Sequence, residues 1–460
     1  GKFALESNTT ASENSAFGYA ALYNNTTGQD DVALGMGALE ANTTGNYNIA
    51  VGNYALDGAT TAHDNLAIGF NALGASVTGD KNIGIGNSAL KSNTSGAENT
   101  ALGFRALISN TTANNNTAVG HNALYTNTTG SNNTGIGRAT MVYNSTGSNN
   151  TSLGYNSLSA NSTANDNTAI GAHALDDNTT GSENVGVGVS ALANNTTGSK
   201  NFAFGWHSML SNTTGNQSCA FGASSLKSSN GSYNNAFGHQ ALEENTTGSM
   251  NIAMGLRALE QNTTGDSNVA IGHAALTANT TADGNTALGA NALSVNTTGH
   301  SNVAIGRQAL DANSTGSSNT AIGQNAAGSW TGSNITAMGY HALLNCTTGG
   351  QNTAFGDNAL QGCATGQDNV AVGTNALYSM TGSYCVAVGR YANMLATGNS
   401  NTSVGYNAGY HTTSGTNNSN FGHGASPSTA TVSNEITLGN TTNDNLRCND
   451  TSISSLSDRR

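Results

Sequence analysis

Large apolar and small residues alternate in a short pattern that recurs along the whole chain. Residues 302–306 read Asn-Val-Ala-Ile-Gly, and residues 319–323 read Asn-Thr-Ala-Ile-Gly. Alternation with a period of two is typical of a β-strand whose two faces differ. The middle residue is Ala, Gly or Ser in every copy except those with Asn420 and Thr437. We therefore expect one face to bury bulky side chains, and the other face to pack so tightly against a partner that only a small side chain fits.

The glycine that closes the pattern sets a period of 17 residues. This period runs from Gly1 and Gly18 to Gly439, and four steps of 16 residues interrupt it. The shorter steps end at Gly238, Gly339, Gly389 and Gly405. A register kept over such a length indicates a repeat protein in which each unit stacks on its neighbours. The sequence predicts an all-β fold, a parallel β-solenoid (β-roll) of about 26 coils.

The rest of each repeat predicts how a coil closes. Leu usually lies four residues after the glycine, as at Leu22 and Leu39, which predicts a second short strand or extended corner around a thin core. Asn-Thr-Thr-Gly, as at residues 25–28, supplies a turn, because Asn and Gly tolerate a positive φ. Asn also opens most copies of the pattern, and stacked Asn side chains can hydrogen-bond from coil to coil. A ligand-binding row of Asn side chains is the functional alternative.

The amino-acid composition argues against nucleic acid and membranes as binding partners. Only 8% of residues are charged, the net charge is −12, and basic clusters are absent from the sequence. Binding to nucleic acid or to an anionic membrane is therefore not expected. No apolar run approaches the ~20 residues that cross a bilayer, so we predict no membrane insertion.

The thin core predicts self-association. Each coil offers two or three apolar side chains, which contribute about 1.5 to 3 kcal/mol apiece, against an ordering cost of about 1 to 2 kcal/mol per residue. The stability of a single column of such coils would therefore be marginal. Three columns around one axis would bury the Ala/Gly/Ser face against identical neighbours, which predicts a homotrimeric fibre.

Two stretches resemble known families. The coils with small residues beside large ones resemble the head repeats of trimeric autotransporter adhesins, which are trimers of parallel β-rolls with a shorter repeat. At the other end, Leu-Arg-Cys at 446–448 and the Ser-rich residues 451–460 are similar to the junction in bacteriophage tail fibres and endosialidase tailspikes. In that family a shaft meets an intramolecular chaperone that trimerises the fibre and then cleaves itself off.

The second resemblance implies a cleavage junction. The family's Ser-Asp-x-Arg-x-Lys pattern corresponds to Ser457, Asp458 and Arg460, and the sequence stops before the Lys. In the family this serine lies at the cleavage point and the lysine assists. We expect the coding sequence to continue with a Lys at the second position after Arg460 and then a helical chaperone domain, which a stop codon after Arg460 would contradict. Because the chain starts within a repeat, we also expect it to be a piece of a longer protein.

The repeat loosens towards this end. Gly409 and Ser426 occupy the leucine site, and Pro427 comes next. We therefore expect regular coil stacking to end after Gly405, with the chains winding together beyond it. The predicted division is a solenoid shaft at 1–422 and a transition segment at 423–460 that leads to the chaperone domain. Receptor contact is expected in the last stretch.

These observations predict a structural protein rather than an enzyme. The favoured interpretation is the shaft of a phage tail fibre or tailspike, which would be extracellular and part of the virion. Such a shaft holds a receptor-binding part towards a glycan or protein on the host cell surface. A bacterial trimeric surface adhesin is one alternative, and it would need a membrane anchor instead of a chaperone. A monomeric extracellular solenoid filament, glycosylated at its many Asn-Thr-Thr sites, is the other.

Other chemistry has few candidates. Histidines and carboxylates are dispersed without a fixed coil offset, so we predict no metal, no cofactor and no catalytic residues. Cys346 and Cys363 replace the turn Asn in adjacent coils, where they should stack at about 4.8 Å, within the Cα range of a disulfide. We expect two free thiols here, with a disulfide between them as the alternative that the spacing allows.

Overall fold

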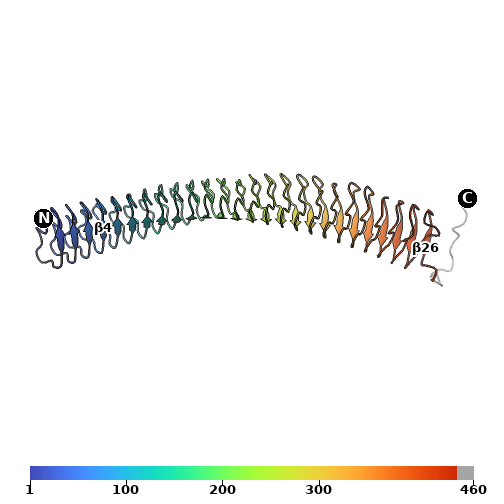
Figure 1. Ribbon diagram of the computed structural model, residues 1–460, viewed down its shortest axis with the longest axis horizontal. Helices are drawn as coiled ribbons and strands as arrows, with labels where there is room; N and C mark the ends of the chain where they lie inside the picture. The colour runs from blue at the N-terminus through green and yellow to red at the C-terminus, as the bar shows by residue number, and fades with distance from the viewer. Residues whose placement is uncertain (443–460) are drawn as a thin grey trace. The chain divides into compact units, whose positions relative to one another are not determined.

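The computed structural model describes residues 1–442, which contain strands and no helix. Within each of the two parts of the chain described next, the short strands are stacked one after another (Figure 1). The chain divides into two compact units, of which one comprises Gly1–Asn268 and the other begins at Val269. The strands of the first unit are β1 (Ser15–Phe17), β2 (Val32–Leu34), β3 (Ile49–Val51), β4 (Leu66–Ile68), β5 (Ile83–Ile85), β6 (Thr100–Leu102), β7 (Thr117–Val119), β8 (Thr134–Ile136), β9 (Thr151–Leu153), β10 (Thr168–Ile170), β11 (Val185–Val187), β12 (Phe202–Phe204), β13 (Cys219–Phe221), β14 (Asn235–Phe237) and β15 (Ile252–Met254).

The second unit continues the same pattern. Its strands are β16 (Val269–Ile271), β17 (Thr286–Leu288), β18 (Val303–Ile305), β19 (Thr320–Ile322), β20 (Thr336–Met338), β21 (Thr353–Phe355), β22 (Val370–Val372), β23 (Val386–Val388), β24 (Thr402–Val404), β25 (Ser419–Phe421) and β26 (Ile436–Leu438). Within each unit, every strand pairs in parallel with the next one in the chain. In β4 and β5, for example, Ala67 lies opposite Gly84, 17 residues later. The predicted parallel β-solenoid with a 17-residue repeat is confirmed.

The two faces of the strands are the reverse of the prediction. The small middle residues point into the coil, where Ala50 and Ala67 are fully buried. The large residues beside them are exposed, as Leu34 is to 45%. The leucine four residues after each glycine fills the interior, and a Cβ added to Gly84 would lie 3.3 Å from Leu73 Cγ. The interior therefore has room for one large side chain and a methyl group. The chain itself packs the small-residue face, and the large residues point outwards.

The corner of the coil also differs from the prediction. Residues around the leucine form turns rather than a second strand, and Leu22 and Ala20 adopt left-handed conformations with φ of 51° and 55°. Equivalent leucines do so in nearly every coil. A left-handed conformation costs a non-glycine residue about 1 to 2 kcal/mol, whereas full burial of a leucine contributes about 1.5 to 3 kcal/mol. Burial of the leucine thus offsets the backbone strain. In the Asn-Thr-Thr-Gly turn, neither Asn25 nor Gly28 has a positive φ.

The glycine of the repeat is required by close stacking. Gly103 has a φ of 142°, a value that side chains disfavour. A Cβ added there would overlap the carbonyl oxygen of Gly120 in the next coil. Successive coils meet backbone to backbone at this point, so the period set by glycine is the period of the stack.

Two buried ladders of Asn side chains connect the coils, which confirms the predicted stacking. In the first ladder, Asn65 Oδ1 accepts hydrogen bonds from Asn82 N at 2.9 Å and Asn82 Nδ2 at 3.2 Å. In the second, formed by the turn asparagines, Asn110 Nδ2 donates to Asn93 Oδ1 at 2.9 Å. All four side chains are 0% to 1% exposed. Because buried amides are satisfied from coil to coil, the ladders fix the register of the stack.

Coil stacking continues beyond the point where the repeat loosens. Strand β25 pairs with β24, and β26 pairs with β25 in the same register. The expectation that stacking ends after Gly405 is therefore wrong, because the backbone ladder persists where the leucine of the repeat is lost. The predicted transition segment at 423–460 lies only partly within the described residues, and its role as a separate region stays a prediction.

Candidate interaction surface

An exposed apolar surface follows the strands of each unit. Side chains at the first and third positions of every strand point outwards, and the third is always large and apolar. The first position is Thr, Ser or Asn in many strands, and we call the large apolar residues at the two positions the apolar stripe. Its more exposed members in the first unit are Phe17, Val32, Leu34, Ile49, Ile68, Ile83, Leu102, Ile136, Leu153, Ile170, Phe202, Phe204, Phe221, Phe237, Ile252 and Met254. In the second unit they are Leu288, Phe355, Val372, Val388, Val404, Phe421, Ile436 and Leu438.

Aromatic rings stack on one another where the stripe crosses strands β12 to β14. The ring centroids of Phe204 and Phe221 are 4.9 Å apart, and those of Phe221 and Phe237 are 6.0 Å apart. Their exposed fractions are 41% to 46%. None of the strands β1 to β26 carries a charged residue. A contiguous apolar surface of this kind is typical of a protein interface, because isolated proteins rarely expose one to water.

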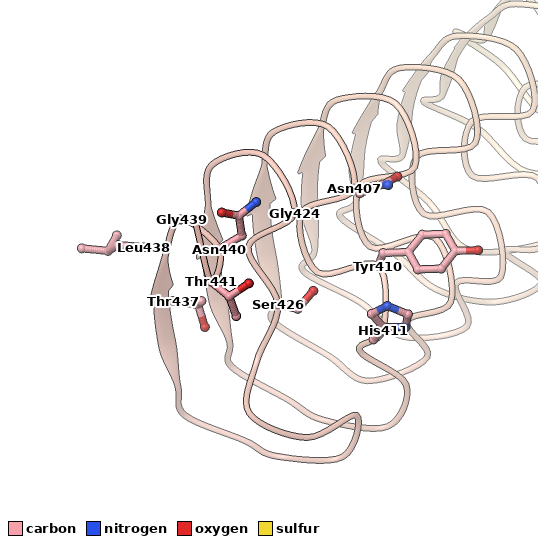
Figure 2. A pocket seen from close by; sticks show the side chains of 10 residues that line it. All are labelled: Asn407, Tyr410, His411, Gly424, Ser426, Thr437, Leu438, Gly439, Asn440 and Thr441. Carbon is pink, nitrogen blue, oxygen red and sulfur yellow. The ribbon is translucent and has the colours of Figure 1, made fainter. Parts of the chain in front are cut away.

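A pocket lies beside the last described coil. It has a volume of about 550 Å³ and is lined by Asn407, Tyr410, His411, Gly424, Ser426, Thr437, Leu438, Gly439, Asn440 and Thr441. Figure 2 shows Ser426 and Thr441 between the last coil and the Tyr410 side of the pocket, with the Leu438 side chain pointing away. The residues that form it come from three successive coils. Sequence reasoning missed the pocket itself, although the replacement of leucine by Gly409 and Ser426 signalled an altered interior.

The predicted cysteine pair lies where the repeat places it. Cys346 and Cys363 are buried as free thiols in adjacent coils. The hydrogen bond between the two thiols, together with burial, raises the pKa of Cys346. Cys363 Sγ also donates to the carbonyl oxygen of Gly366 at 3.3 Å. Both residues are thiols in this structure, and a disulfide between them stays the alternative to be tested.

A third buried thiol was not singled out from the sequence. Cys385 replaces the Asn that opens the repeat, and it accepts a hydrogen bond from Asn401 N at 3.3 Å. Burial raises its pKa to about 11. A thiol of this kind is protonated at neutral pH and therefore a poor nucleophile.

The predicted junction residues Ser457, Asp458 and Arg460 lie outside the described residues. Their assignment rests on the sequence resemblance alone.

The turn asparagines are poorly placed for glycosylation. Asn195 belongs to an Asn-Thr-Thr site but is fully buried. Its Nδ2 donates to Asn178 Oδ1 at 2.7 Å and to the carbonyl oxygen of Gly198 at 2.9 Å. A glycan on this nitrogen would have to break the ladder. The structure therefore favours a role for these asparagines in coil stacking over glycosylation of the turns.

Two observations concern the charged and metal-binding side chains of residues 1–442. No three His, Cys, Asp or Glu side chains there are grouped to hold a metal ion. One carboxyl group is buried in the first Asn ladder, where Asp31 accepts hydrogen bonds from Asn48 N at 2.9 Å and Asn42 Nδ2 at 3.0 Å. Desolvation raises the pKa of Asp31 to about 6. Its surroundings are those of a ladder asparagine, and Asp31 does not line the pockets at 281–301, 308–344 or 407–441.

The same part of the chain contains no helix long and apolar enough to cross a membrane.

Comparison of the chain with known protein families and with curated proteins found no match.

Proposed function

We propose that this chain is the shaft of a homotrimeric phage tail fibre or tailspike, which projects host-receptor binding towards the cell surface. The single observation that carries the proposal is the apolar stripe. Every coil places a large apolar residue at the same outward position, so a second column of coils can pack against the first along its length. Three copies with their stripes turned towards one axis would bury the stripes symmetrically.

The position of the stripe changes which face we propose as the contact between the copies. The sequence suggested that copies meet through the Ala/Gly/Ser face, but that face is filled by the leucines of the same chain. The proposed contact is therefore the opposite face of the same strands. At about 25 cal/mol per Å² of apolar surface removed from water, association through many coils would stabilise the fibre strongly.

The interior supports a mechanical role. Each coil is joined to the next by backbone hydrogen bonds and by buried Asn ladders, as between Asn99 and Asn116, whose N–H donates to Asn99 Oδ1 at 3.0 Å. Bonds repeated along one direction resist bending and local opening. A stiff shaft needs this property, and it needs no catalytic site.

A trimeric surface adhesin would use the same stripe. The two functions differ in the domain expected after Arg460, which is a chaperone in a fibre and a membrane anchor in an adhesin. The Ser-Asp-x-Arg resemblance at 457–460 favours the fibre.

The proposal is tested by placing a charge on the stripe. Phe221→Glu is expected to fold as the parent does, because the side chain is 46% exposed in one chain, but to dissociate the trimer by burying carboxylates near the axis. Met250→Glu is the matched control, since Met250 is 57% exposed and lies off the stripe. Light scattering reports the mass and circular dichroism reports the fold. A parent trimer that Phe221→Glu leaves intact would contradict the proposed interface.

A further inference from the structure

The interior of the coils changes from apolar to polar near the end of the described chain. Leu377 is the last leucine of its column, and Asn393, Gly409 and Ser426 take the equivalent positions in the next three coils. The small strand residues that face this column change as well. They are Ser403 in β24, Asn420 in β25 and Thr437 in β26. These replacements remove large apolar side chains and add groups that form hydrogen bonds.

Several of these groups lack a partner. Ser403 Oγ donates to Asn393 Oδ1 at 2.8 Å and accepts from Asn420 Nδ2 at 3.1 Å. Asn393 Nδ2 and Asn420 Oδ1 are nevertheless buried without a hydrogen bond, as is Oγ1 of Thr412, which takes the place of a turn Asn. An unsatisfied buried polar group costs about 1 to 3 kcal/mol. Such atoms also occur singly in regular coils, as at Asn122 Oδ1, but here Asn393 and Asn420 each have one and both bond to Ser403, which indicates an interior suited to a polar guest.

The polar interior leads to the pocket of Figure 2. Ser426 and Thr437 belong to the two altered columns, and both line the pocket. The pocket therefore borders positions that a leucine and an alanine take in most other coils. Asn407 also lines it, and its Oδ1 is buried without a hydrogen bond. The pocket of about 550 Å³ falls in the size range of small-ligand sites, about 300 to 1,000 Å³.

The lining combines neutral polar groups with aromatic rings. Asn, Ser and Thr side chains surround the pocket together with Tyr410 and His411, and no Lys, Arg, Asp or Glu lines it. More rings lie around Tyr410. The ring centroid of Tyr391 is 6.3 Å from that of Tyr410 and 6.2 Å from that of Tyr406, and His423 stacks on Tyr406 at 5.2 Å.

We propose that this pocket binds a neutral saccharide of one or two rings. Sugar hydroxyl groups both donate and accept hydrogen bonds, so they match amide and hydroxyl side chains, while the apolar face of a sugar ring packs against an aromatic ring. A charged ligand would lose its hydration without meeting an opposite charge. The proposal deepens the fibre function, on which it rests, by naming a glycan as the class of receptor and these coils as the site.

The test is calorimetric titration of the full chain with the methyl glycosides of glucose, galactose and N-acetylglucosamine, and with sialyllactose as the charged comparison. At least one neutral glycoside should bind. Tyr410→Ala should weaken that binding about tenfold or more, a change of roughly 1.4 kcal/mol. Tyr378→Ala is the matched control, because Tyr378 occupies the same position of an earlier coil and does not line the pocket, and it should bind as the parent does.

A second variant covers the case in which Tyr410→Ala misfolds. Ser426→Leu places in the pocket the residue type that fills this column elsewhere, so it should fold and abolish binding. The proposal is overturned if no neutral glycoside binds at millimolar concentration, because the pocket would then hold only water. It is also overturned if only sialyllactose binds, or if Ser426→Leu binds a neutral glycoside as the parent does.

Light scattering on the same samples separates this proposal from the fibre function. A trimer that binds no glycoside would overturn the site and leave the shaft. A monomer that binds one would overturn the trimeric shaft and leave the site.

Discussion

The regular coils and the last described coils share a backbone but differ in what fills them. In the regular coils the interior holds a leucine such as Leu124 and an alanine such as Ala118, both fully buried. In the last coils Asn393 and Asn420 take these positions, and buried polar atoms stay unpaired. Strands β24 to β26 nevertheless keep the parallel register of the stack. Backbone and Asn ladders therefore set the repeat, whereas the leucine column sets how well each coil is packed.

The largest expected difference between the two regions concerns the repeat glycine. Gly103→Ala should destabilise its coil by about 3 to 5 kcal/mol, because the added Cβ combines a strained positive φ with overlap of the next backbone. Gly422→Ala is the matched change in the last coils, where the nearest atom to the added Cβ is Gly439 Cα at 3.2 Å. Its cost should be smaller by about 2 kcal/mol, since the φ strain remains and most of the overlap is absent.

Local hydrogen exchange of each coil measures both changes. Equal losses of protection at Gly103→Ala and Gly422→Ala would show that the last coils stack as tightly as the regular ones.

A smaller effect is expected where a carboxyl group interrupts the Asn ladder. The pKa of Asp31 is raised from 3.8 to about 6 in the folded chain, so the folded chain binds more protons than the unfolded chain within this window. Stability should therefore fall as the pH rises from about 4 to 6, by at most about 3 kcal/mol. Asp31→Asn should restore the ladder and remove this loss.

Urea denaturation at several pH values measures the effect. The exposed carboxylate of Asp64 provides the control. The stability of Asp64→Asn should depend on pH in the same way as that of the parent. A pH dependence that survives in Asp31→Asn would contradict the buried position of Asp31.

The smallest expected effect comes from restoring the leucine column. Asn393 has a φ of 46°, close to that of the leucines in the same column. Asn393→Leu should stabilise its coil by about 1 kcal/mol, because it removes an unpaired buried amide and adds apolar burial, while Ser403 loses one hydrogen bond. The reciprocal change Leu377→Asn should destabilise its coil. Urea denaturation measures both, and a loss of stability in Asn393→Leu would show that the polar interior packs better than a leucine would.

The sequence predicted the class of fold because its period is visible in single residues. Gly103 and its equivalents mark each coil, and the Asn residues predicted the ladders that join them. The direction of the two strand faces was predicted wrongly, because alternation distinguishes two faces but does not say which one is inside. That choice depends on Leu73 and its equivalents, whose left-handed corner turns them into the coil. A φ of this kind cannot be read from a residue type that usually avoids it.

The candidate sites were predictable to different degrees. Cys346 and Cys363 could be paired from the sequence, since the repeat alone places them in adjacent coils. The pocket could not, because its volume depends on how Tyr410 and Thr441 border the space left by Ser426. The sequence showed that a leucine was missing, but only the three-dimensional arrangement shows that the space is left open.

The proposal that identical chains cover the apolar stripe is best tested by the mass of the purified 460-residue chain in solution. Light scattering measures this mass, and gels in SDS run before and after boiling measure how firmly the copies are held. We expect a particle of three times 46.2 kDa that resists SDS until it is boiled. A stable particle of 46.2 kDa with the stripe open to water would show that the proposal is wrong.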